Sequence, residues 1–263
     1  MALPIGIQLY SVRDAAKADL KGTLMQLKKM GYDGVQFAGL YDHSPEEVRD
    51  MCKDIGINPI SAHVGYVNLS SDLEGVFTIY KTIGCKSIAL PWLAPEYRPG
   101  GEKFSEVLAL IERVGNLAKE MGIQFLYHNH YFEFEKIGDK YKLDMLYEQT
   151  DPELLQTEID VCWVAVGGAD PVEYINKYAG RSPVLHLKDY YGERSEETPA
   201  PKVPATFEYR PIGSGCLDFP AIIKAAEAAG TEWLIVEQDS PSKGLTPLEC
   251  AKRSREYLKS IGY

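Results

Sequence analysis

The segment EVLALIERVGNLAKEMGIQFLYHNH (106–130) contains a helical pattern, a glycine stop and a strand, in that order. Leucine, isoleucine and valine recur at three- and four-residue spacings before Gly122, and the β-rich run IQFLYHNH (123–130) follows at once. A glycine just after a helical pattern is the usual residue of a helix C-cap. The segment therefore predicts one helix–strand unit whose strand ends in two histidines.

The same order recurs along the chain. Helical patterns end at Gly31, Gly56, Gly84, Gly122 and Gly230. The β-rich runs between the helical patterns are IGIQLY (5–10), GVQFAG (34–39), NPISAHV (58–64), KSIALPW (86–92), IQFLYHNH (123–130), LLQTEID (154–160), PVLHLKD (183–189) and WLIVEQD (233–239). Strands separated by helices run parallel, because each crossover returns the chain to the same end of the sheet.

This alternation predicts an α/β fold, a single (β/α)8 TIM barrel that spans residues 1–263. Such barrels typically have about 250 residues, close to the 263 of this chain. The alternative is an open doubly wound sheet, which needs a glycine-rich phosphate turn after an early strand. The turn after the first strand, QLYSVRDAA (8–16), contains no glycine, so the barrel is favoured.

Composition and charge argue against several classes of partner. The formal net charge is -10, from 38 acidic and 28 basic residues, which disfavours nucleic acid and anionic membranes as partners. No apolar run approaches the roughly 18 residues of a membrane-spanning helix, and the N-terminal residues show no signal-peptide pattern. The five cysteines form no CxxC motif, which favours free thiols in a reducing compartment. We therefore expect a cytoplasmic protein.

One segment interrupts the alternation. The residues YGERSEETPAPKVPATFEYRPIGSGCLDFP (191–220) are rich in proline, glutamate and glycine and follow the seventh strand. A loop this long in a compact domain is usually functional, and in a barrel it would lie over the catalytic face. We expect an active-site loop at about 191–216, with a solvated excursion as the alternative. Its Gly213-Ser214-Gly215 turn is a weak candidate for a phosphate cradle.

Histidines and carboxylates gather at the carboxyl ends of the predicted strands, where barrel enzymes hold their active sites. Four of the five histidines lie there: His63, His128, His130 and His186. The carboxylates at these ends are Glu133, Glu158, Asp160, Asp189, Glu237 and Asp239. Mixed nitrogen and oxygen donors bind manganese, iron, cobalt, zinc or magnesium according to geometry. The pattern predicts a divalent metal site shared by adjacent strands.

Side chains two residues apart on a strand point to the same side. Glu158 therefore shares a face with Asp160, and His186 shares one with Lys188. If Asp160 binds the metal, Glu158 lies one layer deeper, either as an acid/base group or as a buried carboxylate paired with a cation. His63 is equally open to a catalytic or a structural interpretation.

At these residues the chain resembles the sugar phosphate isomerase/epimerase family, whose members have a xylose isomerase-like (β/α)8 barrel. The resemblance covers essentially the whole chain. It is most specific in YHNHYFEF (127–134), TEIDVCWVAVGGADPVEYINKYAGR (157–181), LHLKD (185–189), GSGCLDFPAIIKAA (213–226) and IVEQD (235–239). It implies one divalent ion, most often manganese, held by Glu, Asp, His and Glu side chains from strands five to eight.

The ligand set departs from this family pattern at one position. Asp160, His186 and Glu237 match the last three ligands, whereas the strand-five glutamate falls on His128. We expect His128 to take that place, with Glu133 as the second candidate. Epimerases of this family resemble two-base enzymes with one carboxylate base on strand five and one on strand eight, and the change removes the first of these. A histidine pair on strand five looks more like the inosose dehydratase branch.

The resemblance implies a metal-dependent isomerase or epimerase of a sugar or keto-sugar, phosphorylated or not, that acts through an enediolate. The alternative is a lyase, dehydratase or hydratase of a 3-keto-sugar, keto-glycoside or inosose-like compound. An abasic-site endonuclease is disfavoured by the net charge, and a non-enzymatic sugar-binding barrel stays open. The sequence is also compatible with a homo-oligomer.

The enzymatic interpretations assign the site residues as follows. The expected catalytic residues are Glu133, Glu158 and Lys188; the metal ligands are His128, Asp160, His186 and Glu237; the substrate-binding residues are His63, His130, Trp92 and Trp163. Manganese is the expected ion, with magnesium, cobalt, zinc and iron as alternatives. The partner is a small carbohydrate.

Overall fold

The computed structural model describes residues 2–193 and 199–263, and parallel strands in this part of the chain close into a barrel. Each barrel strand lies within the range predicted for it. The barrel strands, in sequence order, are β1 Ile5–Gln8, β2 Gly34–Phe37, β3 Asn58–His63, β4 Ser87–Leu90, β5 Gln124–His128, β8 Gln156–Asp160, β9 Val184–Leu187 and β12 Trp233–Val236. Because β1 pairs with both β2 and β12, the barrel is closed, and the open sheet is wrong.

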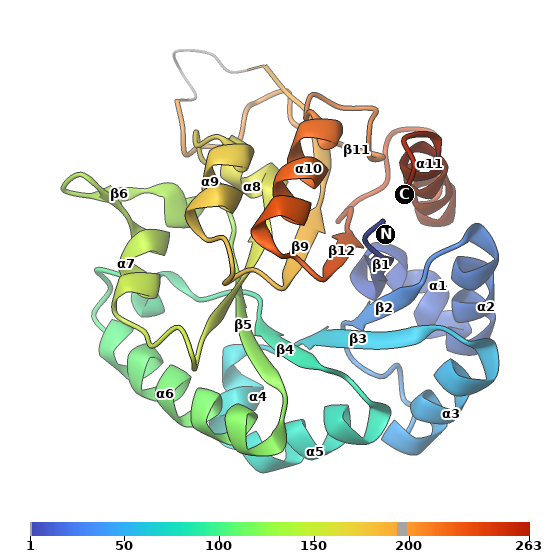
Figure 1. Cartoon of the computed structure of the whole chain (residues 1–263), viewed down its shortest axis with the longest axis horizontal. Helices are drawn as coiled ribbons and strands as arrows, with labels where there is room; N and C mark the ends of the chain where they lie inside the picture. Colours follow the sequence, from blue (N-terminus) through green and yellow to red (C-terminus); the bar gives the residue numbers. More distant parts are fainter. Residues whose placement is uncertain (1, 194–198) are drawn as a thin grey trace.

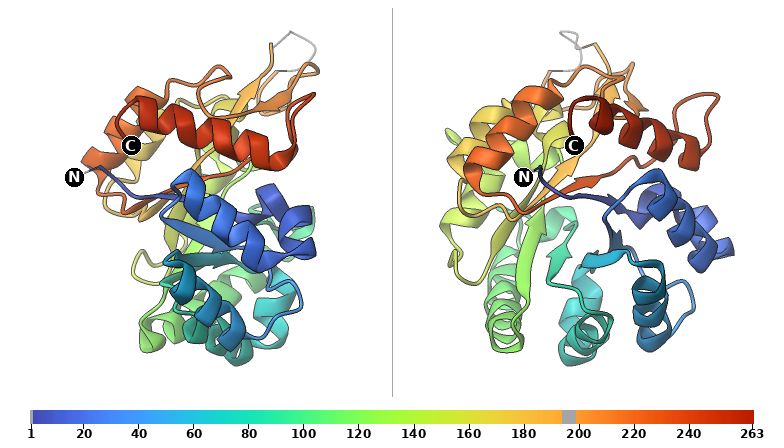
Figure 2. Two further views of the ribbon diagram at one scale, coloured as in Figure 1. Left: turned by 90° about the vertical axis from the view of Figure 1, so that its right-hand side faces the viewer. Right: turned by 45° about the vertical axis from the view of Figure 1, so that its right-hand side comes forward.

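Helices surround the barrel on its outside (Figures 1 and 2). They are α1 Arg13–Ala18, α2 Leu20–Met30, α3 Pro45–Ile55, α4 Tyr66–Ser71, α5 Leu73–Ile83, α6 Phe104–Met121, α7 Lys142–Glu148, α8 Val161–Val166, α9 Pro171–Lys177, α10 Phe219–Ala229 and α11 Pro247–Ser260, with 3-10 helices η1 Leu9–Val12, η2 Pro95–Tyr97 and η3 Phe132–Phe134. The predicted glycine stops all lie at helix C-caps in the left-handed conformation. None of the described helices combines the length and apolar character needed to cross a membrane.

The inside of the barrel is layered. Its lower layer is apolar and consists of Ile60, Ala89, Leu126, Val184 and Ile235. Two strand glycines make room for this layer, because a Cβ atom on Gly6 or Gly34 would lie 2.4 or 2.7 Å from Cδ1 of Ile60. Further along the strands, towards their carboxyl ends, the inward positions become polar.

Strand register brings these polar positions together. In the β8–β9 pair Asp160 lies opposite His186, and in the β5–β8 pair His128 lies opposite Glu158. Parallel neighbours are only about 4.8 Å apart, so side chains from strands far apart in sequence meet at one rim. The barrel thereby positions the candidate site.

The segment predicted as an active-site loop forms an arm, residues 189–217, of which residues 194–198 lie outside the described part. Its strands β10 Asp189–Tyr191 and β11 Glu208–Arg210 pair antiparallel. A separate short hairpin is formed by β6 Lys136–Ile137 and β7 Lys140–Tyr141.

The described part of the arm packs against the rim at the carboxyl ends of the barrel strands. The ring of Phe207 stacks on Trp163 at 5.8 Å and on Tyr190 at 5.2 Å between centroids. The Tyr209 hydroxyl donates a 2.7 Å hydrogen bond to Asp239 Oδ2, just beyond β12. These contacts attach the arm to the barrel and differ from those of a solvated excursion.

Candidate metal and substrate site

Four side chains from neighbouring strands converge at the rim of the barrel: His128 at the end of β5, Asp160 at the end of β8, His186 in β9 and Glu237 just after β12. One possible ligand atom from each lies within 4.8 Å of the others, and all four side chains are buried. His128 Nε2 lies 3.4 Å from Asp160 Oδ2, and His186 Nδ1 lies 3.0 Å from Glu237 Oε2. The structure thus brings together the residues expected to bind a metal.

The polar atoms of this group fit a bound cation. No described residue hydrogen-bonds either ring nitrogen of the buried His128, and Asp160 Oδ2 accepts no hydrogen bond from the described residues, although it lies 3.1 Å from Lys188 Nζ. Buried polar atoms without partners are rare and costly. Two imidazoles with two carboxylates form a ligand set that suits manganese, iron, cobalt or zinc.

The electrostatics of His186 also call for positive charge. Burial alone would lower the pKa of His186, but the carboxylates of Glu158 and Glu237 outweigh burial and raise it to about 10. The carboxylates around this ring therefore favour a second proton or a metal ion beside it.

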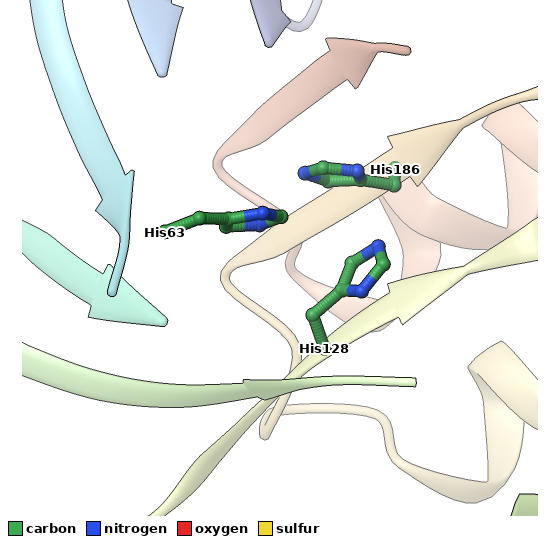
Figure 3. Close-up of side chains that lie close together, drawn as sticks. All are labelled: His63, His128 and His186. Atoms are coloured by element: carbon green, nitrogen blue, oxygen red, sulfur yellow. The ribbon is translucent and has the colours of Figure 1, made fainter. Parts of the chain in front are cut away.

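A second group of possible ligands overlaps the first. The rings of His63, His128 and His186 lie close together (Figure 3), and one nitrogen of each lies within 4.8 Å of the others. However, His63 Nε2 lies 2.7 Å from Glu158 Oε2 and so already has a partner. The mixed group contains two carboxylates, whose negative charge attracts a cation, and is the better metal site.

A buried ammonium group lies beside the mixed group. Lys188 Nζ lies 2.9 Å from Glu237 Oε2 and 3.1 Å from both Asp160 Oδ2 and Asp239 Oδ1. Burial alone would lower the pKa of Lys188, but attraction to these three carboxylates holds it well above the usual value. Lys188 lines the cavity described below and remains a cation there.

Beneath the metal group lies a hydrogen-bonded floor, formed by the fully buried side chains of Gln8, Gln36, Ser61 and Glu158. Glu158 does not line the cavity; its two oxygens bind His63 Nε2 and Gln36 Nε2. Burial would raise the pKa of Glu158, but the imidazoles of His186 and His63 hold it well below its usual value. The position of Glu158 matches the interpretation as a buried carboxylate one layer below Asp160.

Glu133 lies elsewhere than expected. Its carboxylate accepts hydrogen bonds from the Tyr127 hydroxyl at 2.6 Å and from the His130 backbone N–H at 2.8 Å, and burial raises its pKa. Tyr127 precedes His128 on β5 and so points to the opposite side of the strand. Glu133 is thus engaged behind the strand and is not among the residues that line the cavity; its acid/base role stays a prediction.

The cavity above the metal group has a volume of about 460 Å³. Its walls are formed by Tyr10, Ala38, His63, Pro91, Trp92, His128, His130, Lys188, Glu237 and Asp239. Of the expected substrate-binding residues, Trp92 is 47% exposed at this cavity. Trp163 instead lies behind the wall, with its ring 5.7 Å from the ring of His130 and 5.0 Å from Lys188 Nζ.

The Gly213-Ser214-Gly215 turn already holds an anion of the protein itself. The backbone N–H groups of Gly213 and Gly215 donate to Asp189 Oδ2 at 3.0 and 2.8 Å, and that of Tyr190 donates to Asp189 Oδ1 at 2.9 Å. An internal carboxylate thus occupies the place that a phosphate would need. Among the described residues that line the cavity, Lys188 is the one lysine or arginine.

Sequence reasoning placed Glu158 one layer below Asp160 but missed the two glutamines of the floor. Gln8 is the last residue of the strand IGIQ (5–8), and Gln36 lies one residue before the end of the strand GVQF (34–37). Both are completely buried. A polar residue near the carboxyl end of an apolar strand is the signal that could have found them, although an uncharged amide does not by itself suggest catalysis or metal binding. Tyr10, a wall residue in η1, has no signal that separates it from other loop tyrosines.

Comparisons with known proteins agree with the barrel fold. The family model described as "Xylose isomerase-like TIM barrel" matches residues 24–261. A relative named inosose dehydratase, from Geobacillus kaustophilus (strain HTA426), is 26% identical over 266 residues, which cover 90% of this chain and 86% of the relative. Other relatives with the same name match 56% to 62% of this chain and 50% to 56% of their own length.

Two solved structures are also similar. A sugar phosphate isomerase/epimerase from Parabacteroides distasonis ATCC 8503 is 25% identical, has a TM-score of 0.80, and covers 100% of this chain and 95% of its own. The IOLI protein, crystallised with a bound zinc atom, is 14% identical with a TM-score of 0.74 and covers 98% of each chain. This second likeness shows the fold alone.

Proposed function

This chain belongs to the xylose isomerase-like TIM barrel family, an enzyme family, and from that premise we propose that it is a metal-dependent lyase that eliminates water from a neutral cyclic keto-polyol such as an inosose. The observation that carries the proposal is His128, an imidazole on β5 in the metal group, where the isomerase pattern holds a carboxylate. The relatives named inosose dehydratase support the same reaction.

His128, Asp160, His186 and Glu237 are the proposed metal ligands, with manganese as the proposed native ion. When bound, a divalent ion supplies Lewis-acid polarisation of a substrate carbonyl or hydroxyl oxygen. Lys188 donates hydrogen bonds to substrate oxygens from the same side of the cavity, because its ammonium group lies beside two of these ligands.

His63 is the proposed proton carrier. It lines the cavity, and the buried carboxylate of Glu158 holds its Nε2 atom, as in enzymes where an acid orients a histidine base. Burial outweighs the attraction of Glu158 and lowers the pKa of His63, so the neutral ring can accept a proton. Glu158 acts through His63 and does not touch the substrate.

The reaction needs only one such group. His63 removes the proton on the carbon next to the carbonyl, a C=C bond forms to the following carbon, and the hydroxyl on that carbon leaves. The proton taken by His63 departs with this hydroxyl as water, so the ring returns to its neutral form. An epimerase would instead need a second group to return the proton from the opposite face.

The substrate is proposed to be unphosphorylated. A phosphate group carries about 1.5 to 2 negative charges near neutral pH and would enter a cavity lined by Glu237 and Asp239. The positive charge of Lys188, the one lysine or arginine among the described lining residues, is outnumbered by the three carboxylates around it, so these side chains offer no excess of positive charge to a phosphate. The turn that could have bound phosphate is filled by Asp189.

Isomerisation or epimerisation of a sugar is the second candidate, favoured by the similarity to the isomerase/epimerase from Parabacteroides distasonis. Incubating manganese-loaded protein with an inosose and a panel of 3-keto-sugars in deuterated water, followed by NMR and mass spectrometry, separates the two reactions. Loss of one water from a substrate is the expected result, and Asp160→Asn should abolish it. A deuterated epimer or isomer formed without loss of water would overturn the lyase and favour the second candidate.

A further inference from the structure

Gln36 lies in the centre of the floor, and every hydrogen-bonding position of its side chain is used. Its Nε2 donates to Glu158 Oε1 at 2.5 Å and to Ser61 Oγ at 2.6 Å. Its Oε1 lies 2.7 Å from both Gln8 Nε2 and His186 Nε2. An amide offers two hydrogens and two lone pairs, so no capacity is left over.

Two independent anchors determine which way the Gln36 amide points. On one side an ionised carboxylate, Glu158, can only accept, so it must face the Gln36 NH₂ group. On the other side, Gln8 Oε1 accepts from the Tyr10 backbone N–H at 3.1 Å. Gln8 therefore donates a hydrogen bond from its own NH₂ group, and Gln36 must accept it through its side-chain oxygen. Both anchors give the same orientation.

This orientation determines the state of the metal ligand above. Because Gln36 presents oxygen to His186 Nε2, that nitrogen must carry a hydrogen. The lone pair of a neutral His186 then lies on Nδ1, the atom 3.0 Å from Glu237 Oε2. Two acceptors would face each other there, so either a proton or a metal ion must lie between Nδ1 and Glu237. We infer that Gln36 is a positioning residue that fixes the tautomer of His186, so that this ring binds the metal through Nδ1.

The inference rests on the metal site of the proposed function, but its first test needs no substrate. In the zinc-loaded full-length protein, labelled with ¹⁵N-histidine, long-range ¹H–¹⁵N spectra distinguish a protonated ring nitrogen from a metal-bound one. The expected result is a protonated Nε2 and a zinc-bound Nδ1 for His186. Zinc on Nε2 of His186 would overturn the assignment.

The second test is metal affinity. Gln36→Met removes the acceptor at nearly constant volume and should weaken zinc binding about 10- to 100-fold, the usual effect of losing a partner of a metal-bound histidine. Gln26→Met is the matched control, because it is the same substitution at an exposed position of α2 and leaves the contacts of the site in place. Its zinc Kd should equal that of the wild type. Chelator competition measures both.

The outcomes separate this inference from the proposed reaction. A folded Gln36→Met protein, judged by circular dichroism, that binds zinc as tightly as the wild type would overturn the positioning role. A wild-type protein that holds zinc through Nδ1 yet dehydrates no inosose would overturn the reaction and support the positioning role. A protein that dehydrates inosose with zinc on Nε2 would support the reaction and overturn the positioning role.

Discussion

Glu158 Oε2 lies 2.7 Å from His63 Nε2, and in this pair the imidazole faces the cavity while the carboxylate is completely buried beneath it. A buried carboxylate is costly unless its oxygens are paired. Here one oxygen binds His63 and the other binds Gln36. The pair therefore links the floor of the barrel to the group proposed to move the proton.

The first prediction concerns His63. Replacing it by glutamine retains a hydrogen bond to Glu158 but removes the base, so turnover should fall about 100- to 10,000-fold, the usual contribution of general acid–base catalysis. Zinc affinity should not change. His43→Gln, the same substitution at the histidine beside the α3 N-cap, is the control and should retain full activity. Loss of zinc binding in His63→Gln would instead identify His63, His128 and His186 as the metal ligands.

The second prediction concerns Lys188. In chelator-treated protein, Lys188→Met leaves the carboxylates of Asp160 and Glu237 without their cation and should cost about 3 to 5 kcal/mol of unfolding free energy. Added zinc should restore part of this loss, since it brings positive charge to the same oxygens. Lys177→Met removes a half-exposed lysine from its ion pair with Asp144, whose carboxylate keeps two tyrosine hydrogen bonds, and should cost only about 1 kcal/mol. Urea unfolding with and without zinc measures these differences; equal losses in the two variants would contradict the burial argument.

The third prediction concerns metal removal. At a free zinc concentration 100 times its Kd, bound zinc adds about 2.7 kcal/mol to the free energy of unfolding, so a chelator should lower the unfolding temperature of the wild type. Asp160→Asn should lose this response. Asparagine at 160 can still accept the hydrogen bond from the Trp163 backbone N–H that caps α8, so helix capping is retained. A chelator effect of equal size in both proteins would place the metal elsewhere.

The barrel and the converging ligands could be predicted because their signals are local. Helix spacing, glycine stops and strand-end polarity are read within a few residues, and parallel strands bring the polar ends to one rim. Asp160 and His186 needed no more than strand assignment, because their neighbouring strands place them side by side.

The rest depends on contacts between distant residues. Gln36 meets His186 across 150 positions and Glu158 across 122, and no local pattern specifies such pairings. Glu133 follows β5 by only a few residues, yet the turn η3 directs its side chain behind the strand to Tyr127. The side to which a residue points can be predicted inside a strand, where side chains alternate. This prediction fails at the first irregular turn.

The fourth prediction concerns acid stability and Asp144 in α7. Burial would raise the pKa of Asp144, but hydrogen bonds from Lys177, Tyr178 and Tyr174 outweigh it and lower the pKa. The folded value is below the unfolded one, so the stabilisation is complete above the ordinary pKa, about 3.9, and disappears as pH falls through the folded value. Asp144→Asn should therefore be less stable than the wild type at neutral pH, and the gap should shrink in acid. A gap independent of pH in urea unfolding would contradict this.

The fifth prediction concerns Asp189, whose carboxylate fills the nest of backbone N–H groups at Gly213 and Gly215. Asp189→Ala empties the nest and leaves these donors unpaired, so their amide hydrogens should exchange faster and the arm should detach from the rim. Formate should rescue the variant by entering the nest, because a carboxylate is the group that the nest binds.

Asp218→Ala is the control for this rescue. It removes the carboxylate that accepts the Ala221 backbone N–H at the N-cap of α10, a few residues from the nest, and leaves Asp189 in place. Hydrogen exchange near Gly215 should then be unchanged, with or without formate. The arm also carries Tyr209, whose hydroxyl holds Asp239 of the cavity wall, so we expect Asp189→Ala to lose activity as well and to regain it in formate. Rapid exchange that formate does not slow would show that the arm is held by the stacking of Phe207 on Trp163 and that the carboxylate is dispensable.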